Sequence, residues 1–404
     1  MRRVAISALA LALIAIACAR PRPRIDAIEF WEPWPPAVVA PLVAHFEAEN
    51  PAQHVHVRQM SLATVSDSLA AALAAGAGPD LCVLPGACMP RWLASSALCD
   101  WSAGVADLRD SLRGWPLCTV GEALYGLPCL LDVRTLLVHP QLFARAGLDS
   151  AKPPHTWEQL HAAAVRVQKL GHGVHGFGIA TGDSLAATAE FLAFVAGNGG
   201  QVLSQELDSA RIDSPEALAA LAFYLSLRRS ALVAAPDTLA REFAAGRLAM
   251  MLADAPARAD VRRAVPGAVV ALVPRPAGEL GTHATWADAV VLVGFTGSHR
   301  KEAALRLARS LARREGLGAL AAATDGLAPA YGDADSLELP AGASAAQVLA
   351  RQGESAHFAP AVAHWDSMCT AIAFEVGEAL HDRKSAAAAL TDAAARVTEL
   401  AGRR

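Results

Sequence analysis

The sequence has little of several features that mark common classes of protein. Aromatic residues make up 5% of the 404 positions, and the formal net charge is only −4. A mildly acidic chain is a poor candidate for binding nucleic acid. After residue 17 no uncharged apolar run approaches the roughly 18 residues that a membrane-spanning helix needs. We also find no internal repeat of the length that builds solenoids.

The seven cysteines include no Cys-x-x-Cys pair, which makes a zinc site improbable. Six of them follow residue 18, and an even number in an exported protein permits three disulfides with about 15 possible pairings. Simple buried thiols are the alternative, and the irregular spacing does not decide between the two. The six cysteines are Cys82, Cys88, Cys99, Cys118, Cys129 and Cys369.

The N-terminus reads as an export signal. Two arginines precede an uncharged apolar stretch at residues 4–17. As a helix this stretch would reach about 21 Å, short of the roughly 30 Å hydrocarbon core of a bilayer. A positive start, a short apolar run and small residues before a cleavage point are typical of a secretory signal peptide, here residues 1–17.

The residues that follow the apolar run indicate a lipid anchor. The tetrapeptide at 15–18, Ala-Ile-Ala-Cys, resembles the lipobox of bacterial lipoproteins, in which the cysteine, here Cys18, is acylated. From there to residue 24 arginine and proline alternate, which predicts a stiff, extended tether. We therefore expect an exported lipoprotein on the cell membrane, facing the periplasm or the cell exterior. The alternative is an ordinary exported protein with an incidental cysteine.

The sequence after the tether alternates between patterns typical of strands and patterns typical of helices. Apolar residues predict strands at 25–31, 54–60 and 80–84, with helices near 38–46 and 70–75 between them. This alternation indicates an α/β protein with a mostly parallel sheet covered by helices on both faces. No linker interrupts the remaining chain, which favours domains that are interleaved in sequence.

Two later helices are marked by local signals. Thr156 and Gln159 have the spacing of a capping box and open one helix. Amphipathic spacing predicts one long helix at 300–314.

Several segments in order resemble one family over residues 25–400. The first is Tyr-Gly-Leu-Pro at 125–128, followed by Asp132, by Leu-Phe-Ala-Arg-Ala-Gly-Leu at 142–148 and by the Pro-Pro-His-Thr-Trp run from 153. Further matches are at 243–250, 326–329 and 365–380. Together they resemble the family-1 extracellular solute-binding proteins of ABC importers, which include maltose- and glycerol-phosphate-type binders.

The resemblance implies a type II periplasmic-binding-protein fold, with two α/β lobes, each a mostly parallel sheet flanked by helices, joined by hinge strands. Crossings are expected near 130–134, 283–287 and 336–345. The N-terminal lobe would comprise residues 25–131 plus 285–335, and the C-terminal lobe residues 132–284 plus 336–404.

The implied function is capture of a carbohydrate or related polyol by hinge closure, with delivery to the permease subunits and their ATPase. Such a protein is a monomer that needs no cofactor and catalyses no reaction.

Eight residues are candidates for contacting the ligand. Three follow the first strand, where open α/β sheets bind ligands, and tryptophan faces stack on sugar rings: Trp31, Glu32 and Trp34. The others are Asp80, Asp132, Asp183, Trp286 and Trp365. For the first three, packing on the hydrophobic edge of their own loop is the alternative. Asp80 could equally form a turn, and Trp286 could either floor the pocket or fill it.

Three other functions compete with sugar capture. Gly-Asp-Ser-Leu at 182–185 matches the motif of an esterase family. No Asp-x-x-His segment that could supply the catalytic partners follows it, so we do not expect an enzyme. Metal capture would use four histidines close in sequence, His155, His161, His172 and His175. A scaffold or sensor lipoprotein with the same fold is the third alternative.

Overall fold

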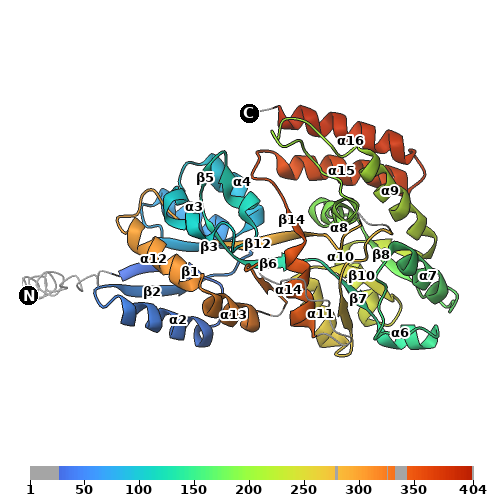
Figure 1. Cartoon of the computed structure of the whole chain (residues 1–404), viewed down its shortest axis with the longest axis horizontal. Helices are drawn as coiled ribbons and strands as arrows, with labels where there is room; N and C mark the ends of the chain where they lie inside the picture. The colour runs from blue at the N-terminus through green and yellow to red at the C-terminus, as the bar shows by residue number, and fades with distance from the viewer. Residues whose placement is uncertain (1–26, 278–280, 325, 333–343, 403–404) are drawn as a thin grey trace, which may run out of the picture.

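The computed structural model describes residues 27–277, 281–324, 326–332 and 344–402. The predicted signal peptide, Cys18, the tether and most of the crossing expected at 336–345 lie outside the described residues. The rest of the chain forms two α/β lobes side by side (Figure 1), so the predicted fold class is confirmed. In the described ranges, no helix has the length and apolarity to cross a membrane.

The first lobe is built on a mixed sheet. In the described part of the chain the strand order is β13-β6-β12-β3-β1-β2, and β14 pairs with the start of β12. The strands are β1 (Ala27–Glu32), β2 (His54–Gln59), β3 (Leu81–Pro85), β6 (Leu127–Val133), β12 (Thr285–Gly294), β13 (Ala328–Pro329) and β14 (Ala356–Phe358). β1 runs parallel to β2 and β3, but β12 is antiparallel to both β3 and β6.

Helices cover this sheet where amphipathic segments predict them. They are α2 (Pro36–Glu49), α3 (Val65–Ala74), α4 (Met89–Ala94), α5 (Ser102–Val105), α12 (Lys301–Leu311) and α13 (Arg314–Ala323), with 3₁₀ turns at Gly86–Cys88, Ala106–Leu108 and Trp115–Cys118 and a small hairpin of β4 (Thr119–Val120) and β5 (Ala123–Leu124). The prediction of a single helix over 300–314 is wrong at the C-terminal end. α12 stops at Leu311, Arg313 is extended, and α13 begins at Arg314. Gly316 permits this break, since a Cβ there would lie 2.4 Å from the Leu311 carbonyl oxygen.

The second lobe has a three-stranded sheet, β10-β7-β11, in which both pairings are antiparallel, and a parallel pair, β8 and β9. Its strands are β7 (Thr135–Val138), β8 (Phe177–Ala180), β9 (Ala231–Ala234), β10 (Met250–Ala253) and β11 (Val269–Ala271). Its helices are α6 (Pro140–Arg145), α7 (Trp157–Gln168), α8 (Ser184–Gly197), α9 (Pro215–Leu227), α10 (Pro236–Ala244), α11 (Ala255–Ala264), α15 (Trp365–Leu380) and α16 (Ala386–Ala401), with a 3₁₀ turn at Arg228–Ser230. The expectation of mostly parallel sheets is therefore corrected: the first sheet is mixed, and the three-stranded sheet of the second lobe is antiparallel.

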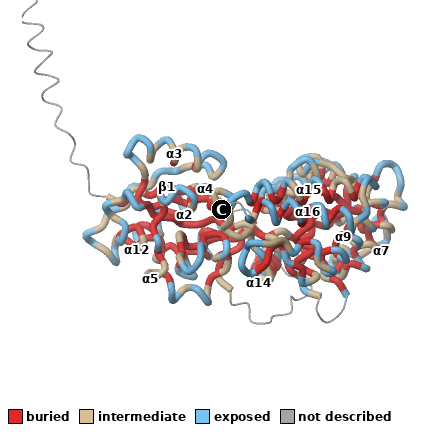
Figure 2. The backbone as a smooth tube through the Cα atoms, turned by 90° about the horizontal axis from the view of Figure 1, so that it is seen from above, coloured by how far each residue is buried: buried red, intermediate tan, exposed pale blue. Residues whose placement is uncertain are grey.

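The chain crosses between the sheets at Arg134. This residue separates β6 of the first sheet from β7 of the second, at the place where a crossing is predicted. α14 (Ala345–Glu354) lies between the two lobes in Figure 1 and contacts both β6 and β11. Buried residues form separate hydrophobic cores in the two lobes, visible as red segments in both halves of Figure 2.

The six cysteines of the described chain are all free thiols. Five are buried and Cys88 is half-buried. Burial raises the pKa of the Cys82, Cys118 and Cys369 thiols, so these groups stay protonated and act as small apolar side chains.

One glycine is required by close packing between α7 and β8. A Cβ on Gly176 would lie 2.2 Å from the carbonyl oxygen of Ala164 and 2.5 Å from its Cα, and backbone atoms cannot move aside as a flexible side chain can. We expect Gly176→Ala to lower the free energy of unfolding by about 1–3 kcal/mol, measured by urea denaturation.

The matched control is Gly318→Ala in α13, where an added Cβ meets no heavy atom within 4 Å. This change should stabilise the protein by about 0.4–1 kcal/mol, because alanine restricts the unfolded chain. Equal stability of the Gly176 variant and the wild type would contradict the close packing.

Candidate functional site

A pocket of about 250 Å³ opens between the two lobes. It is formed by the turn after β3, the crossing from β6 to β7, the start of β12, and the N-termini of α8, α11 and α15. Small-molecule sites usually measure about 300–1,000 Å³, so this pocket suits a small ligand. Four of the eight predicted ligand-contacting residues line it: Asp132, Asp183, Trp286 and Trp365.

Two carboxylates lie on the floor of the pocket because of strand register. Asp288 of β12 is paired directly with Asp132 of β6, so the two side chains share one face of the sheet. Asp288 accepts hydrogen bonds from the backbone N–H of Ala87 (3.3 Å) and of Ala289 (2.7 Å). Burial raises the pKa of Asp288 to about 6. Gly86 lies against it, and a Cβ there would displace the Asp288 carboxylate, since it would lie 2.2 Å from Asp288 Oδ1.

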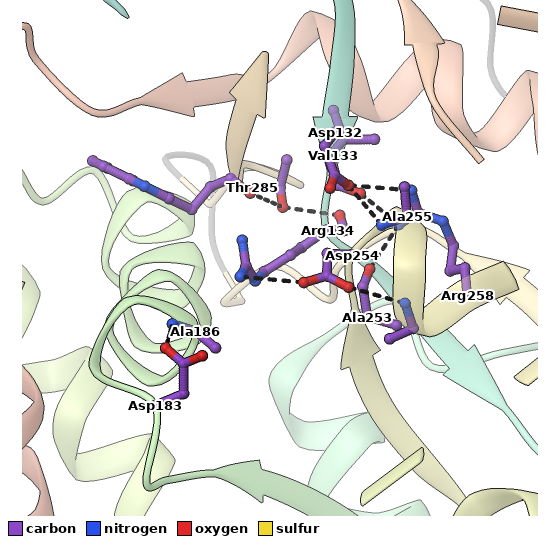
Figure 3. Close-up of polar contacts among 12 residues, drawn as sticks. Asp132, Val133, Arg134, Asp183, Ala186, Ala253, Asp254, Ala255, Arg258 and Thr285 are labelled. Atoms are coloured by element: carbon purple, nitrogen blue, oxygen red, sulfur yellow. Dashed lines mark hydrogen bonds and ion pairs between the residues drawn. The ribbon is translucent and has the colours of Figure 1, made fainter. Parts of the chain in front are cut away.

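Asp132 joins the crossing strand to α11. Its Oδ1 accepts a hydrogen bond from the backbone N–H of Ala255 (2.7 Å) and lies 3.6 Å from the guanidinium of Arg258 (Figure 3). Burial, and then the nearby Asp254 carboxylate, raise the pKa of Asp132; Arg258 and Arg134 only partly offset this.

Arg134 and Asp254 face each other at the crossing. A guanidinium nitrogen of Arg134 lies 3.9 Å from Asp254 Oδ2, and the Arg134 carbonyl accepts a hydrogen bond from the Thr285 hydroxyl (2.9 Å). Asp254 also caps α11, because its Oδ1 accepts from the backbone N–H of Ala257 (3.1 Å). These contacts tie both crossings to the N-terminus of α11 (Figure 3).

Asp183 reaches the pocket from the second lobe. Gly182 adopts a positive φ of 80° after β8, which turns the chain so that Asp183 precedes α8. The Asp183 carboxylate caps this helix by accepting from the backbone N–H of Ala186 (3.0 Å). The Gly-Asp-Ser-Leu segment is therefore a turn and a helix cap on the rim of the pocket.

The aromatic wall of the pocket is a pair of stacked indoles. The rings of Trp286 and Trp365 lie 5.8 Å apart with an interplanar angle of 13°. Trp365 is buried at the start of α15, and Trp286 is half-buried on β12. The prediction left open whether Trp286 floors or fills the pocket; its ring lines the wall beside Trp365.

The other four predicted residues do not line this pocket. Asp80 precedes β3 at the opposite end of the sheet, where it accepts a hydrogen bond from the backbone N–H of Glu29 (2.9 Å). Trp31 lines a separate hollow with Asp80, and its ring lies 4.7 Å from the guanidinium carbon of Arg58. Asp80 directly precedes β3, so it lies at the N-terminal end of that strand. Ligands of such sheets bind at the C-terminal ends of the strands.

Glu32 ends β1 and Trp34 follows it, and both side chains are buried. A Glu32 oxygen accepts from the backbone N–H of Trp34 (2.5 Å), and burial raises the pKa of Glu32 to about 7. Trp31 and Trp34 both belong to the hydrophobic core of the first lobe.

Sequence reasoning missed several lining residues. Arg134 ends the predicted first crossing and Asp288 follows Trp286 by two positions, so both lay inside segments already singled out. No local pattern in the sequence marks Asp254 or Asp366 as a pocket residue, although both line the pocket. They enter the pocket only because α11 and α15 begin there.

The histidine cluster does not assemble into a site in the described structure. Across the residues that the structure describes, no three His, Cys, Asp or Glu side chains gather closely enough to hold a metal ion. The ring of His155 instead packs edge-on against His283, with centroids 6.0 Å apart. His172 occupies a turn with a positive φ of 55°.

Two α/β lobes with a polar and aromatic pocket between them define a two-lobed binding protein. The chain belongs to the family of bacterial extracellular solute-binding proteins, whose family model matches residues 32–317. A binding protein of Brucella abortus (strain 2308) is 25% identical over 279 residues. That alignment spans 65% of this chain and 65% of the relative.

Solved structures share the fold along nearly the whole chain. An ABC transporter solute-binding protein from Thermotoga lettingae TMO, bound with alpha-D-tagatose, is 25% identical with a TM-score of 0.71, covering 93% of this chain and 100% of that one. The cyclic alpha-maltosyl-1,6-maltose binding protein from Arthrobacter globiformis has a TM-score of 0.81 at 20% identity, covering 94% and 99%. The sugar-binding protein MalE from Xanthomonas citri has a TM-score of 0.76 at 24% identity, covering 94% and 98%.

Proposed function

We propose that this protein is the substrate-binding subunit of an ABC importer, and that it captures a carbohydrate or related polyol in the pocket between the lobes. The stacked Trp286–Trp365 pair beside several carboxylates is the observation that carries the proposal. Indole faces pack against the C–H faces of a sugar ring, while carboxylates accept hydrogen bonds from its hydroxyls. The tagatose bound to the Thermotoga lettingae protein supports the same assignment.

The mechanism is capture by hinge closure without chemistry. The pocket takes residues from both lobes: Asp132 and Asp288 lie on the first sheet close to the crossings, and Asp183 comes from the second lobe. A ligand favours the closed form only by the difference between its affinities for the closed and open forms. We propose that the permease and its ATPase take the ligand from that closed form.

The sequence supports three further proposals, on where the protein is located, on its oligomeric state and on where its lobes begin and end. We propose that Cys18 carries the lipid that holds the protein at the membrane, with residues 18–24 as its tether, and that the protein acts as an exported monomer. The lobe boundaries proposed are 131/132 and 284/285 for the two crossings that the structure describes. Arg134, which separates β6 from β7, lies within three residues of the first boundary.

The test is a ligand screen by thermal shift and calorimetry on the purified protein. A panel of monosaccharides, disaccharides and polyols should contain at least one member that stabilises it, by about 2.7 kcal/mol at a hundredfold excess over Kd. Trp286→Ala should weaken that ligand at least tenfold, because it removes the half-buried ring of the stack.

Phe374→Ala is the control, since it deletes an exposed aromatic ring of α15 that is not part of this pocket. It should bind like the wild type. The proposal fails if no sugar or polyol stabilises the folded protein, or if Trp286→Ala binds the ligand as tightly as the wild type.

A further inference from the structure

Acidic side chains outnumber basic ones in the described lining of the pocket. Five carboxyl groups line it, from Asp132, Asp183, Asp254, Asp288 and Asp366, beside one cation, Arg134. Counting Arg258, which lies behind Asp132 and is buried, the acidic side chains still outnumber the basic ones by three.

The acidic excess is larger here than in the other hollows described. The hollow between β1 and β3 is lined by two acids, Glu29 and Asp80, and two arginines, Arg58 and Arg300. The hollow beside α12 is lined by one acid and three arginines: Glu49, Arg306, Arg309 and Arg313. A third hollow, beside α8, exceeds balance by one acid, with Asp183, Glu378 and Arg383.

The side chains of the described lining offer more acceptors than donors. Ionised carboxylates only accept hydrogen bonds. The side chains that can donate are Arg134, the two indoles, the Cys369 thiol, which is a weak donor, and Thr188, whose hydroxyl already donates to the Cys369 carbonyl (2.8 Å). A neutral sugar needs donors for its ring and hydroxyl oxygens as well as acceptors. An ammonium group has three donors and no acceptor, so it matches an acceptor-rich wall.

A metal ion does not account for the acids. In the described part of the chain no three such side chains converge on one point, and the five carboxylates come from five separate segments. Dispersed acids suit a ligand with donors spread over its surface. The indole pair adds to this, because ring faces attract cations as well as C–H groups.

We infer that the ligand of this pocket is a polyol that carries a protonated amino group, as an amino sugar does. This inference rests on the proposed function and narrows its substrate class. The hydroxylated ring packs on the Trp286–Trp365 wall, and the ammonium group donates to the carboxylates on the floor and rim.

The experiment compares matched ligand pairs by calorimetry on the full-length protein at pH 7. The pairs are glucose with glucosamine, galactose with galactosamine, and cellobiose with the chitosan dimer. For the pair that fits the pocket, the amino member should bind at least tenfold more tightly. Raising the salt from 50 to 500 mM should reduce this preference, because screening weakens charge pairs that solvent reaches.

Asp366→Asn tests the role of the carboxylates, since Asp366 is an exposed acid in the first turn of α15 on the pocket wall. It should weaken the amino member more than the neutral member, so that the amino preference falls at least threefold. Glu302→Gln is the matched control, because Glu302 is also an exposed acid in a first turn, that of α12, away from the pocket. It should leave both affinities unchanged.

The outcomes separate this inference from the proposed function. Equal or tighter binding of neutral sugars overturns the amino group and leaves sugar capture standing. Preference for glucuronic acid over glucose overturns it as well. Binding of putrescine, an amine without hydroxyls, with no binding of any sugar or amino sugar overturns the proposed function. No binding of any probe by the folded protein overturns both.

Discussion

Arg258→Ala is expected to lower the free energy of unfolding by about 3–5 kcal/mol, because it leaves buried partners uncompensated. The Arg258 guanidinium, on α11, is almost wholly buried. It donates to the carbonyls of Val133 (2.5 Å), Ala253 (2.6 Å) and Gly326 (2.6 Å), which belong to the crossing, the end of β10 and the segment before β13. It also lies 3.6 Å from Asp132. Alanine removes the donors and keeps the buried acceptors, which is the costly way to break a hydrogen bond.

The measurement is the urea midpoint and the melting temperature of the variant against the wild type. Arg263→Ala is the control on the same helix. Arg263 is exposed, pairs with the nearby Asp260 and donates to the Ala259 carbonyl (3.4 Å), so its loss should cost under about 0.5 kcal/mol. Arg258→Lys should fall between the two, since an ammonium cannot reach all three carbonyls. A stability of Arg258→Ala within 1 kcal/mol of the wild type would show that these contacts do not hold the crossing together.

The contribution of Glu190 to stability is expected to grow as the pH falls from 8 to 5, and Glu190→Gln should remove this contribution. Glu190 of α8 is buried, and its Oε1 accepts from the Tyr224 hydroxyl (2.6 Å) and the backbone N–H of Ala180 (3.2 Å). Burial raises the pKa of Glu190 from 4.5 to about 7. A carboxyl with a higher pKa in the folded state binds its proton more tightly when folded, so this stabilisation is present at low pH and lost as the pH rises through 7.

The shift of Glu190 corresponds to roughly 3 kcal/mol between pH 5 and pH 8. Glutamine mimics the protonated acid and keeps the acceptor oxygen. Glu190→Gln should therefore be more stable than the wild type at pH 8 and similar to it at pH 5. Glu32 and Asp288 act in the same direction, because burial raises the pKa of Glu32 to about 7 and that of Asp288 to about 6.

Glu378→Gln is the control for the pH series. The Arg383 guanidinium beside Glu378 holds the pKa of that carboxyl below its usual range, so it titrates below the window. The control curve should run parallel to the wild type between pH 5 and 8. Parallel curves for Glu190→Gln and the wild type would contradict a raised pKa of Glu190.

Local chemistry made much of the fold predictable. The capping box at Thr156 and Gln159 forms as expected, because its hydrogen bonds join residues three positions apart. The first strands and helices follow from apolar spacing, which reports directly on burial. The helix predicted at 300–314 breaks at Leu311, and the close approach that Gly316 permits there is not revealed by spacing alone.

Part of the pocket was also predictable. Asp132, Asp183, Trp286 and Trp365 occur in segments that resemble a family or follow a predicted strand, and the structure places all four on the pocket. Asp80 and Trp31 sit in equally suggestive segments and line a different hollow. Asp80 precedes β3 and so lies at the end of the sheet away from the pocket, whereas strand packing, a long-range property, decides which side chains of β1 reach a hollow.

The sequence by itself determined the alternation of strands and helices, the family, and a leader that predicts export. Each of these depends on neighbours along the chain or on a pattern repeated in order. Only the tertiary structure decided the acidic character of the pocket and the burial of Arg258 beneath it. Asp132 meets Asp288 through strand register across 156 positions of sequence, and Arg258 meets Val133 across 125. Contacts of that separation are set by how the sheets pack, and no local pattern records them.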